Sequence, residues 1–249
     1  MNTLKLSMTV FIGLILSISI ALSGFFVGHG IYKSRALDRY VTVKGLVEKR
    51  VQANIAQWDI DYRVTGDDLQ KLSDQMAHNQ KLVFDFLSAH GFKPEEMNAQ
   101  AMSVIDQYAK EYGGPEKPTH RYIIKGGVTL RSSNVDLVKS VSQLAPSLIE
   151  KGIALAGNDY DANPKYMYTQ LDQIRPELLR EATQSARRMA QQFALDSNSQ
   201  LAGIRRANQG QFQVLDKNGG AGGYNENQLK SIVKTIRVVS SIDYYLVSK

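Results

Sequence analysis

The sequence predicts an α+β fold in which a largely antiparallel sheet packs with three main helices and follows one N-terminal transmembrane helix. Three observations predict it. Several stretches alternate β-forming residues with polar ones, three longer stretches space apolar residues three and four apart, and the chain before residue 33 is mostly apolar. Because strands, hairpins and helices are mixed along the chain, the sheet is expected to be antiparallel.

The composition is that of a globular protein. The 249 residues are 43% hydrophobic and 22% charged, and the formal net charge is +6. The basic residues are scattered along the chain, which is typical of a solvated surface. The absence of cysteine excludes disulfides, a thiolate nucleophile and cysteine-ligated metal sites.

The N-terminal segment carries no formal charge between Lys5 and Lys33. A helix over Leu6 to Gly28 is about 34 Å long, enough for a hydrocarbon core of about 30 Å. This run exceeds the 7 to 15 or so apolar residues of a removable signal peptide, so a retained anchor is predicted. Its apolar side chains are Leu6, Val10, Phe11, Ile12, Leu14, Ile15, Leu16, Ile18, Ile20, Leu22, Phe25, Phe26 and Val27.

A cleaved segment is the alternative, because Ala21-Leu22-Ser23 fits a signal peptidase site. Cleavage would leave a soluble periplasmic or outer-membrane-associated protein. With retention, the chain divides into a signal-anchor (residues 1–32), a short charged linker (33–39) and one α+β domain (40–249).

The α+β domain begins with two predicted strands between residues 40 and 66, where Gly45 indicates a bulge or a close backbone approach. A helix follows, capped by Asp67 or Asp68 and ending near His90 and Gly91. Asn79 lies on its apolar stripe and is interpreted as a hydrogen-bonded residue that fixes packing. The stripe comprises Leu69, Leu72, Met76, Val83, Phe86 and Leu87.

Strands are predicted over residues 97–108 and 119–132, before a second helix from Val135 to Lys151 capped by Asn134. Pro146 is expected to kink or divide this helix. Its predicted buried side comprises Leu137, Val138, Val141, Leu144, Leu148 and Ile149.

The third predicted helix runs from Gln170 to Leu195, with a kink or a new start near Pro176. Its alanine ladder allows another backbone to approach closely. The chain then ends in a long two-stranded arm with a glycine-rich tip at residues 219–223. The predicted stripe of the helix comprises Leu171, Ile174, Leu178, Ala182, Ala186, Met189, Ala190 and Phe193.

No motif for catalysis is present. The four histidines lack a ligand spacing, and no nucleophile elbow or phosphate-binding loop occurs. We therefore expect no enzymatic activity, no cofactor, no metal site and no nucleic-acid partner, and the sequence identifies no small-molecule substrate. The alternative is a module that binds an anionic ligand, either a lipid headgroup or nucleic acid, through Arg187, Arg188, Arg205 and Arg206.

Four stretches carry a family resemblance. They are "VTVKGLVEKRVQANIAQWDI" from residue 41, Asn79 followed by "LSAHGF", the closing "IRVVSSIDYYLV", and above all "YTQLDQIRPELLREATQSARRMAQQFALDSNSQLAGIRRANQGQFQVLD" from residue 168. Over nearly all of residues 40 to 249 the chain resembles the SIMPL-domain family of bacterial periplasmic and outer-membrane antigens.

The resemblance implies an α+β envelope protein that forms homo-oligomers, in some members large rings, and is linked to envelope or oxidative stress tolerance. It implies no catalytic residues. Combined with the anchor, it predicts a single-pass protein in lipid of the bacterial inner membrane, with its main domain in the periplasm. The long N-terminal run and the extended tip depart from the commoner family pattern.

Overall fold

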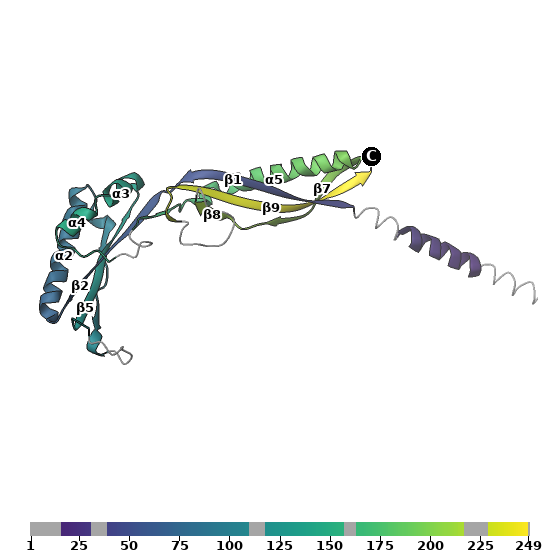
Figure 1. Cartoon of the computed structure of the whole chain (residues 1–249). Helices are drawn as coiled ribbons and strands as arrows, with labels where there is room; N and C mark the ends of the chain where they lie inside the picture. Colours follow the sequence, from purple (N-terminus) through teal and green to yellow (C-terminus); the bar gives the residue numbers. More distant parts are fainter. Residues whose placement is uncertain (1–15, 31–38, 110–117, 157–162, 217–228, 249) are drawn as a thin grey trace, which may run out of the picture. The chain divides into compact units, whose positions relative to one another are not determined.

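The computed structural model describes residues 16–30, 39–109, 118–156, 163–216 and 229–248. Residues 16–30 form a helix (Figure 1). The other helices and strands are β1 (Tyr40–Gln52), β2 (Ile55–Gly66), α2 (Leu69–Ala89), β3 (Met97–Ala99), β4 (Ser103–Asp106), β5 (Tyr122–Ser132), α3 (Val135–Ser142), α4 (Pro146–Glu150), β6 (Lys165–Met167), α5 (Leu171–Asp196), β7 (Ser199–Gln209), β8 (Gln213–Asp216) and β9 (Val233–Ser248). The predicted α+β class with antiparallel sheets is confirmed.

Two compact units divide the chain. Unit 1 comprises the chain up to Val47 together with Glu177–Gln211 and Val238–Lys249, and unit 2 comprises Glu48–Pro176 and Phe212–Arg237. The division cuts β1, α5 and β9, so each of these elements contributes residues to both units. The sequence pattern, which suggested one domain over residues 40–249, gave no sign of it.

The sheet of unit 2 has the strand order β3-β5-β2-β6, and β4 pairs with another part of β5. Its centre is the antiparallel pair of β2 and β5, whose register runs from Ala56 opposite Ser132 to Gly66 opposite Tyr122. Because side chains alternate across a strand, β2 presents its even-numbered residues to one face and its odd-numbered residues to the other.

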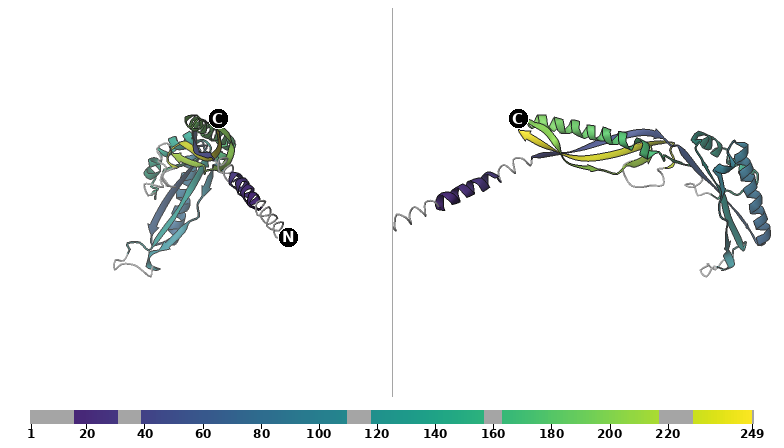
Figure 2. Two further views of the ribbon diagram at one scale, coloured as in Figure 1. Left: turned by 90° about the vertical axis from the view of Figure 1, so that its right-hand side faces the viewer. Right: turned by 180° about the vertical axis from the view of Figure 1, so that it is seen from behind.

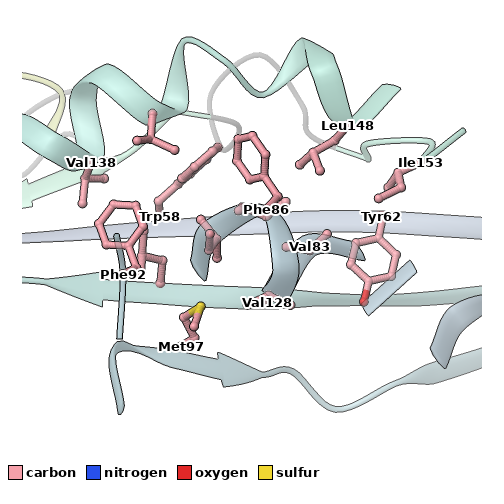
Figure 3. Close-up of a cluster of buried hydrophobic side chains, with 14 of the residues drawn as sticks. Trp58, Tyr62, Val83, Phe86, Phe92, Met97, Val128, Val138, Leu148 and Ile153 are labelled. Carbon is pink, nitrogen blue, oxygen red and sulfur yellow. The ribbon is translucent and has the colours of Figure 1, made fainter. Parts of the chain in front are cut away.

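The core of unit 2 lies on the even-numbered face of β2. There Trp58, Ile60 and Tyr62 are at most 3% exposed. They pack with apolar side chains from three helices (Figure 3). The helical side chains at most 5% exposed are Leu72, Met76, Val83, Phe86 and Leu87 of α2, Val138 and Val141 of α3, and Leu148 of α4.

Helix α2 begins and ends as its sequence predicts. The side chain of Asp68 accepts hydrogen bonds from the backbone N–H groups of Gln70 and Lys71, which satisfies two donors of the first turn. His90 is the C-cap, and Gly91 follows with a φ of +92°, a conformation that glycine adopts without strain.

The prediction for Asn79 was half right. The side chain lies on the buried stripe of α2 and is 4% exposed, as expected. Its Nδ2 group, however, donates a hydrogen bond to no residue in the described ranges. The expectation of a fully hydrogen-bonded asparagine is therefore wrong for this donor, because the neighbouring side chains of the stripe are apolar.

Pro146 divides the second predicted helix, as expected. Helix α3 ends at Ser142, and Pro146 occupies the first turn of α4, where its missing N–H costs no hydrogen bond. The division changes which side chains are buried. Leu144 is 48% and Ile149 58% exposed, so their predicted burial is wrong.

The fold of unit 1 rests on the contact between α5 and a sheet with the order β1-β9-β7 (Figures 1 and 2). Ala182, Ala186 and Ala190 are fully buried, and Val43 of β1 with Ile242 and Tyr244 of β9 completes the packing. The alanine ladder thus does what the sequence predicted, because its small side chains let the helix lie close to the sheet.

Gly45 of β1 marks the closest approach. A Cβ at this position would stand 1.9 Å from the backbone oxygen of Ala182, so only glycine fits. The structure therefore selects the close backbone approach from the two meanings that the sequence left open for this glycine.

One prediction for α5, the burial of its whole apolar stripe, was wrong. Met189 and Phe193 are 46% and 55% exposed, because burial on α5 is confined to a narrow row, Leu178 and the alanines at every fourth position after it. For Pro176 the sequence left a kink or a new start open, and the structure excludes the new start, because Pro176 lies inside the continuous helix Leu171–Asp196.

The predicted C-terminal arm is divided. Its first strand splits into β7 and β8 at Gly210, whose N–H donates to the carbonyl of Val239 on β9. Both β7 and β8 pair with β9. The glycine-rich tip at residues 219–223 lies outside the described residues.

We expect Gly45→Ala to lower the free energy of unfolding by about 1–3 kcal/mol, because the new methyl group must displace α5 from the sheet. Thermal unfolding of the full-length protein in detergent, followed by circular dichroism, measures the effect. Gly203→Ala on β7 is the matched control, since a Cβ there meets nothing within 4 Å. Equal melting temperatures for both variants would contradict the close contact.

Candidate functional site

The N-terminal helix exposes its apolar side chains. Of the predicted anchor residues, Leu6 to Ile15 lie outside the described residues. The remaining ones, in the helix of residues 16–30, are between 50% and 69% exposed: Leu16, Ile18, Ile20, Leu22, Phe25, Phe26 and Val27. In the part of the chain that the structure describes, no helix combines the length and the apolar character needed to cross a membrane.

The arginines proposed for anion binding lie on two elements of unit 1. Arg187 and Arg188 are exposed on α5. Burial raises the pKa of the Tyr244 phenol, and the positive charge of Arg187 opposes that rise, so this guanidinium acts on a core residue of unit 1.

Arg205 and Arg206 lie on β7, at a register irregularity between Ile204 and Arg206. The guanidinium of Arg205 lies 4.0 Å from the ring centroid of Tyr40, a cation–π contact. Arg206 stands opposite Asp243 on β9. Arg205 therefore has an aromatic partner within unit 1, and anion binding by the four arginines stays a prediction.

A row of hydrogen-bonded polar side chains, the polar row, follows the odd-numbered face of unit 2. The Nε2 of Gln100 donates to Oγ1 of Thr129 at 3.1 Å, and this hydroxyl donates to Oδ1 of Asp59 at 2.8 Å. Gln57 also donates to Asp59, and the Nζ of Lys165 lies 3.8 Å from its Oδ2. These residues come from four separate segments, and their bonds fix each other's positions.

A cleft of about 380 Å³ adjoins the polar row at Gln100. Its walls are lined by Asp61, Tyr62, Arg63, Gln100, Ala101, Ser103, Lys125, Gly126 and Ala156. Ala156 is held there by the hydrogen bond from its N–H to the carbonyl of Asp61, at 2.7 Å. Most of the side chains that line the cleft are polar or charged, which suits a polar ligand.

The carboxylate of Asp61 lies against β5 at Gly127. A Cβ at residue 127 would stand 2.7 Å from Oδ1 of Asp61 and 2.9 Å from Oε1 of Gln100, so glycine makes room for both. Oδ1 of Asp61 is buried and accepts no hydrogen bond from any residue in the described ranges. Such an acceptor without a donor is uncommon in proteins.

Two cations stand beside this carboxylate. Arg63 on β2 is directly opposite Lys125 on β5, and both side chains are exposed. Neither forms an ion pair with a carboxylate elsewhere in the described part of the chain. Like charges at opposite positions of an antiparallel pair repel each other, so this arrangement costs stability.

A second cleft of about 570 Å³ lies between α3, β6 and the start of β9, lined by Lys139, Ser142, Gln143, Asn163, Pro164, Tyr166, Lys230, Ser231, Ile232 and Val233. Next to it, Asp216 of β8 accepts hydrogen bonds from the buried Lys234 and from the backbone N–H of Ser231. Burial lowers the pKa of Lys234, and the bond to Asp216 opposes this effect. These groups satisfy each other and hold β8 on β9.

Two surface carboxylates next to the start of β5, those of Asp67 and Asp106, have lowered pKa values. Hydrogen bonds from the backbone N–H of Arg121 and from His120 hold the pKa of Asp67 below its usual range. The guanidinium of Arg121 lowers the pKa of Asp106 in the same way.

Among the described residues, no group of three or more His, Asp or Glu side chains lies close enough together to hold a metal ion.

The sequence analysis missed the cleft residues. Asp61 and Arg63 are 60 or so positions from Lys125, and no local pattern links them before the register of β2 and β5 is known. One signal was present: Gly126-Gly127 inside a predicted strand indicates a close approach of other atoms.

A comparison with protein families gives one match. The profile described as "SIMPL: Protein of unknown function (DUF541)" matches residues 41–231. A search of curated proteins found no match.

The buried Tyr62 is expected to make the stability of the protein depend on pH under alkaline conditions. Burial raises its pKa from 10.0 to about 12, so the unfolded chain releases this proton first. The stability that it contributes, roughly 2–3 kcal/mol, is full below pH 10 and is lost as the pH rises toward 12. We expect Tyr62→Phe to flatten the loss of stability in this range, measured by urea unfolding at several pH values. Tyr108→Phe, at an exposed position, should leave the slope unchanged; an unchanged slope in Tyr62→Phe would contradict the assignment.

Proposed function

Because the chain belongs to the SIMPL family, which has no assigned function, we propose a function from its own residues. It is a non-enzymatic protein of the bacterial cell envelope, anchored in the inner membrane by its N-terminal segment, whose periplasmic part assembles with copies of itself. The exposed apolar helix at residues 16–30 carries this proposal.

The anchor follows from the cost of leaving this helix in water. Seven large apolar side chains that are half exposed or more would each gain about 1.5–3 kcal/mol on full burial. The helix exposes them on all sides, as a membrane span does. Together with the uncharged residues from Leu6 onward, the segment reaches the length of about 20 residues that a bilayer requires.

The orientation and the compartment rest on the family. Positive charges flank the segment on both sides, at Lys5 and at Lys33, Arg35 and Arg39, so charge alone sets no direction. The chain resembles the SIMPL-domain family of bacterial envelope proteins, and this resemblance favours the periplasm as the compartment of its main domain. A link to envelope or oxidative stress tolerance belongs to the proposal on the same ground.

Self-association is supported by unit 1. In its sheet order, β1 and β7 are edge strands, and edge strands offer unpaired backbone groups to another chain. Met189 and Phe193, one helical turn apart on α5, are exposed, and so is Ile204 on β7, at 51%. A second copy that covers these side chains would remove apolar surface from water.

The anchor is tested by introducing charge. We expect Ile18→Arg with Leu22→Arg to shift the protein from the carbonate-resistant membrane fraction to the soluble fraction, since each charge at a membrane depth costs about 2.5–3.5 kcal/mol. Ile18→Leu with Leu22→Ile is the control, which should stay in the membrane. Intact-mass analysis of the extracted wild-type protein must find the N-terminal segment present; its absence would establish the cleaved-signal alternative.

Assembly is tested on α5. We expect Met189→Glu with Phe193→Glu to weaken self-association of the full-length protein in detergent by about tenfold or more, because two apolar side chains lose their burial. Native mass spectrometry over a concentration series measures it. Leu144→Glu with Ile149→Glu, equally exposed but in unit 2, is the matched control. A wild-type protein that is monomeric at every concentration contradicts the proposal.

A further inference from the structure

We propose that the cleft of unit 2 bordered by Asp61, Arg63 and Lys125 binds a small acidic molecule with two anionic groups and one donor group, an ammonium or a hydroxyl. This site is separate from the anchor and from the surface proposed for assembly. It uses none of the arginines at positions 187, 188, 205 and 206.

The two cations are the first reason. The register of β2 and β5 places Arg63 and Lys125 directly opposite each other, with both side chains exposed and without an ion pair in the described part of the chain. Their repulsion disappears when an anion lies between them. A guanidinium and an ammonium side by side offer forked donors and a point charge, which together hold carboxylates or similar anions.

The carboxylate is the second reason. Asp61 precedes Arg63 by two residues on the same face of β2, and its side chain lines the cleft. No described residue donates a hydrogen bond to it, and no described cation lies within ion-pair distance. Oδ1 is buried, whereas Asp61 as a whole is half-buried and lines the cleft, so a donor bound in the cleft pairs with the other oxygen of this carboxylate.

The surroundings keep these groups in place. The N–H of Gln100 donates to the carbonyl of Gly127 at 2.9 Å, and its side chain is fixed by Thr129. Gly127 leaves the space that the Asp61 carboxylate occupies. No ion pair joins Asp61 to Arg63 or Lys125 in the described part of the chain, so these charges of opposite sign remain available to a bound molecule.

The pattern of charges defines the ligand. Two cations and one carboxylate are complementary to a molecule with two anionic groups and one ammonium group, and a hydroxyl group can replace the ammonium as donor. A cleft of about 380 Å³ suits a molecule of a few to a dozen or so heavy atoms. Ser103, which also lines the cleft, adds a hydroxyl for a further polar group.

Three matched probes test this assignment: L-glutamate, 2-hydroxyglutarate and glutarate, which differ only in the ammonium, hydroxyl or hydrogen on the second carbon. We expect the affinity for the full-length protein in detergent, measured by isothermal titration calorimetry, to fall in that order. Binding should weaken with rising salt, because the cations are exposed. Failure of all three probes to bind overturns the proposal, as does equal affinity for L-glutamate and glutarate.

Variants assign the roles. Arg63→Gln and Lys125→Gln should each lower the affinity for all three probes by about tenfold or more, the effect of losing one charge-assisted hydrogen bond. Asp61→Asn should remove the preference for L-glutamate over glutarate while glutarate still binds. Lys81→Gln on α2, an exposed lysine on another element, is the matched control and should change nothing. Unchanged affinities in the first two variants overturn the proposal.

One further variant separates binding from folding. Arg63→Glu places opposite charges across β2 and β5, so we expect a melting temperature raised by roughly 1–4 °C together with loss of L-glutamate binding. A variant that is more stable and still binds with wild-type affinity would overturn the role of Arg63.

Discussion

The alternation of side chains along β2 is the constraint on which unit 2 depends. Its even-numbered residues build the core with three helices, and its odd-numbered residues therefore must leave that core on the other face. A shift of one residue in register would bury Asp59, Asp61 and Arg63 and expose Trp58 and Tyr62. The same alternation that holds the unit together thus also sets out its charged groups in a fixed order.

Helix α5 packs on the sheet of unit 1 through a row of small side chains, which is only a weak signal in the sequence. Alanines at every fourth position give the helix a row too small to form a core by itself, and Gly45 supplies the complementary space on β1. Larger apolar residues beside the row, such as Met189 and Phe193, are left outside because the helix lies so close to the sheet.

Much of this could be predicted where the cause is local. The cap at Asp68, the stop at Gly91 and the break at Pro146 each follow from the chemistry of one residue and its neighbours. Burial at Leu144, Ile149 and Phe193 could not, because a helical stripe gives the direction of a side chain but not the width of the surface that it meets. The sequence could not show that the Nδ2 group of Asn79 lacks an acceptor or that Arg63 lies opposite Lys125. Both depend on how distant segments of the chain pack and pair.

The division into two units has a consequence for work with fragments. The boundary is crossed after Val47, Pro176, Gln211 and Arg237, so each unit is assembled from separated stretches of the chain. Neither unit corresponds to one continuous gene fragment. A truncation at any loop within residues 48–237 removes strands or helices from both units at once, and only a design that deletes the stretches of the other unit and rejoins the cut ends with new linkers could isolate one of them.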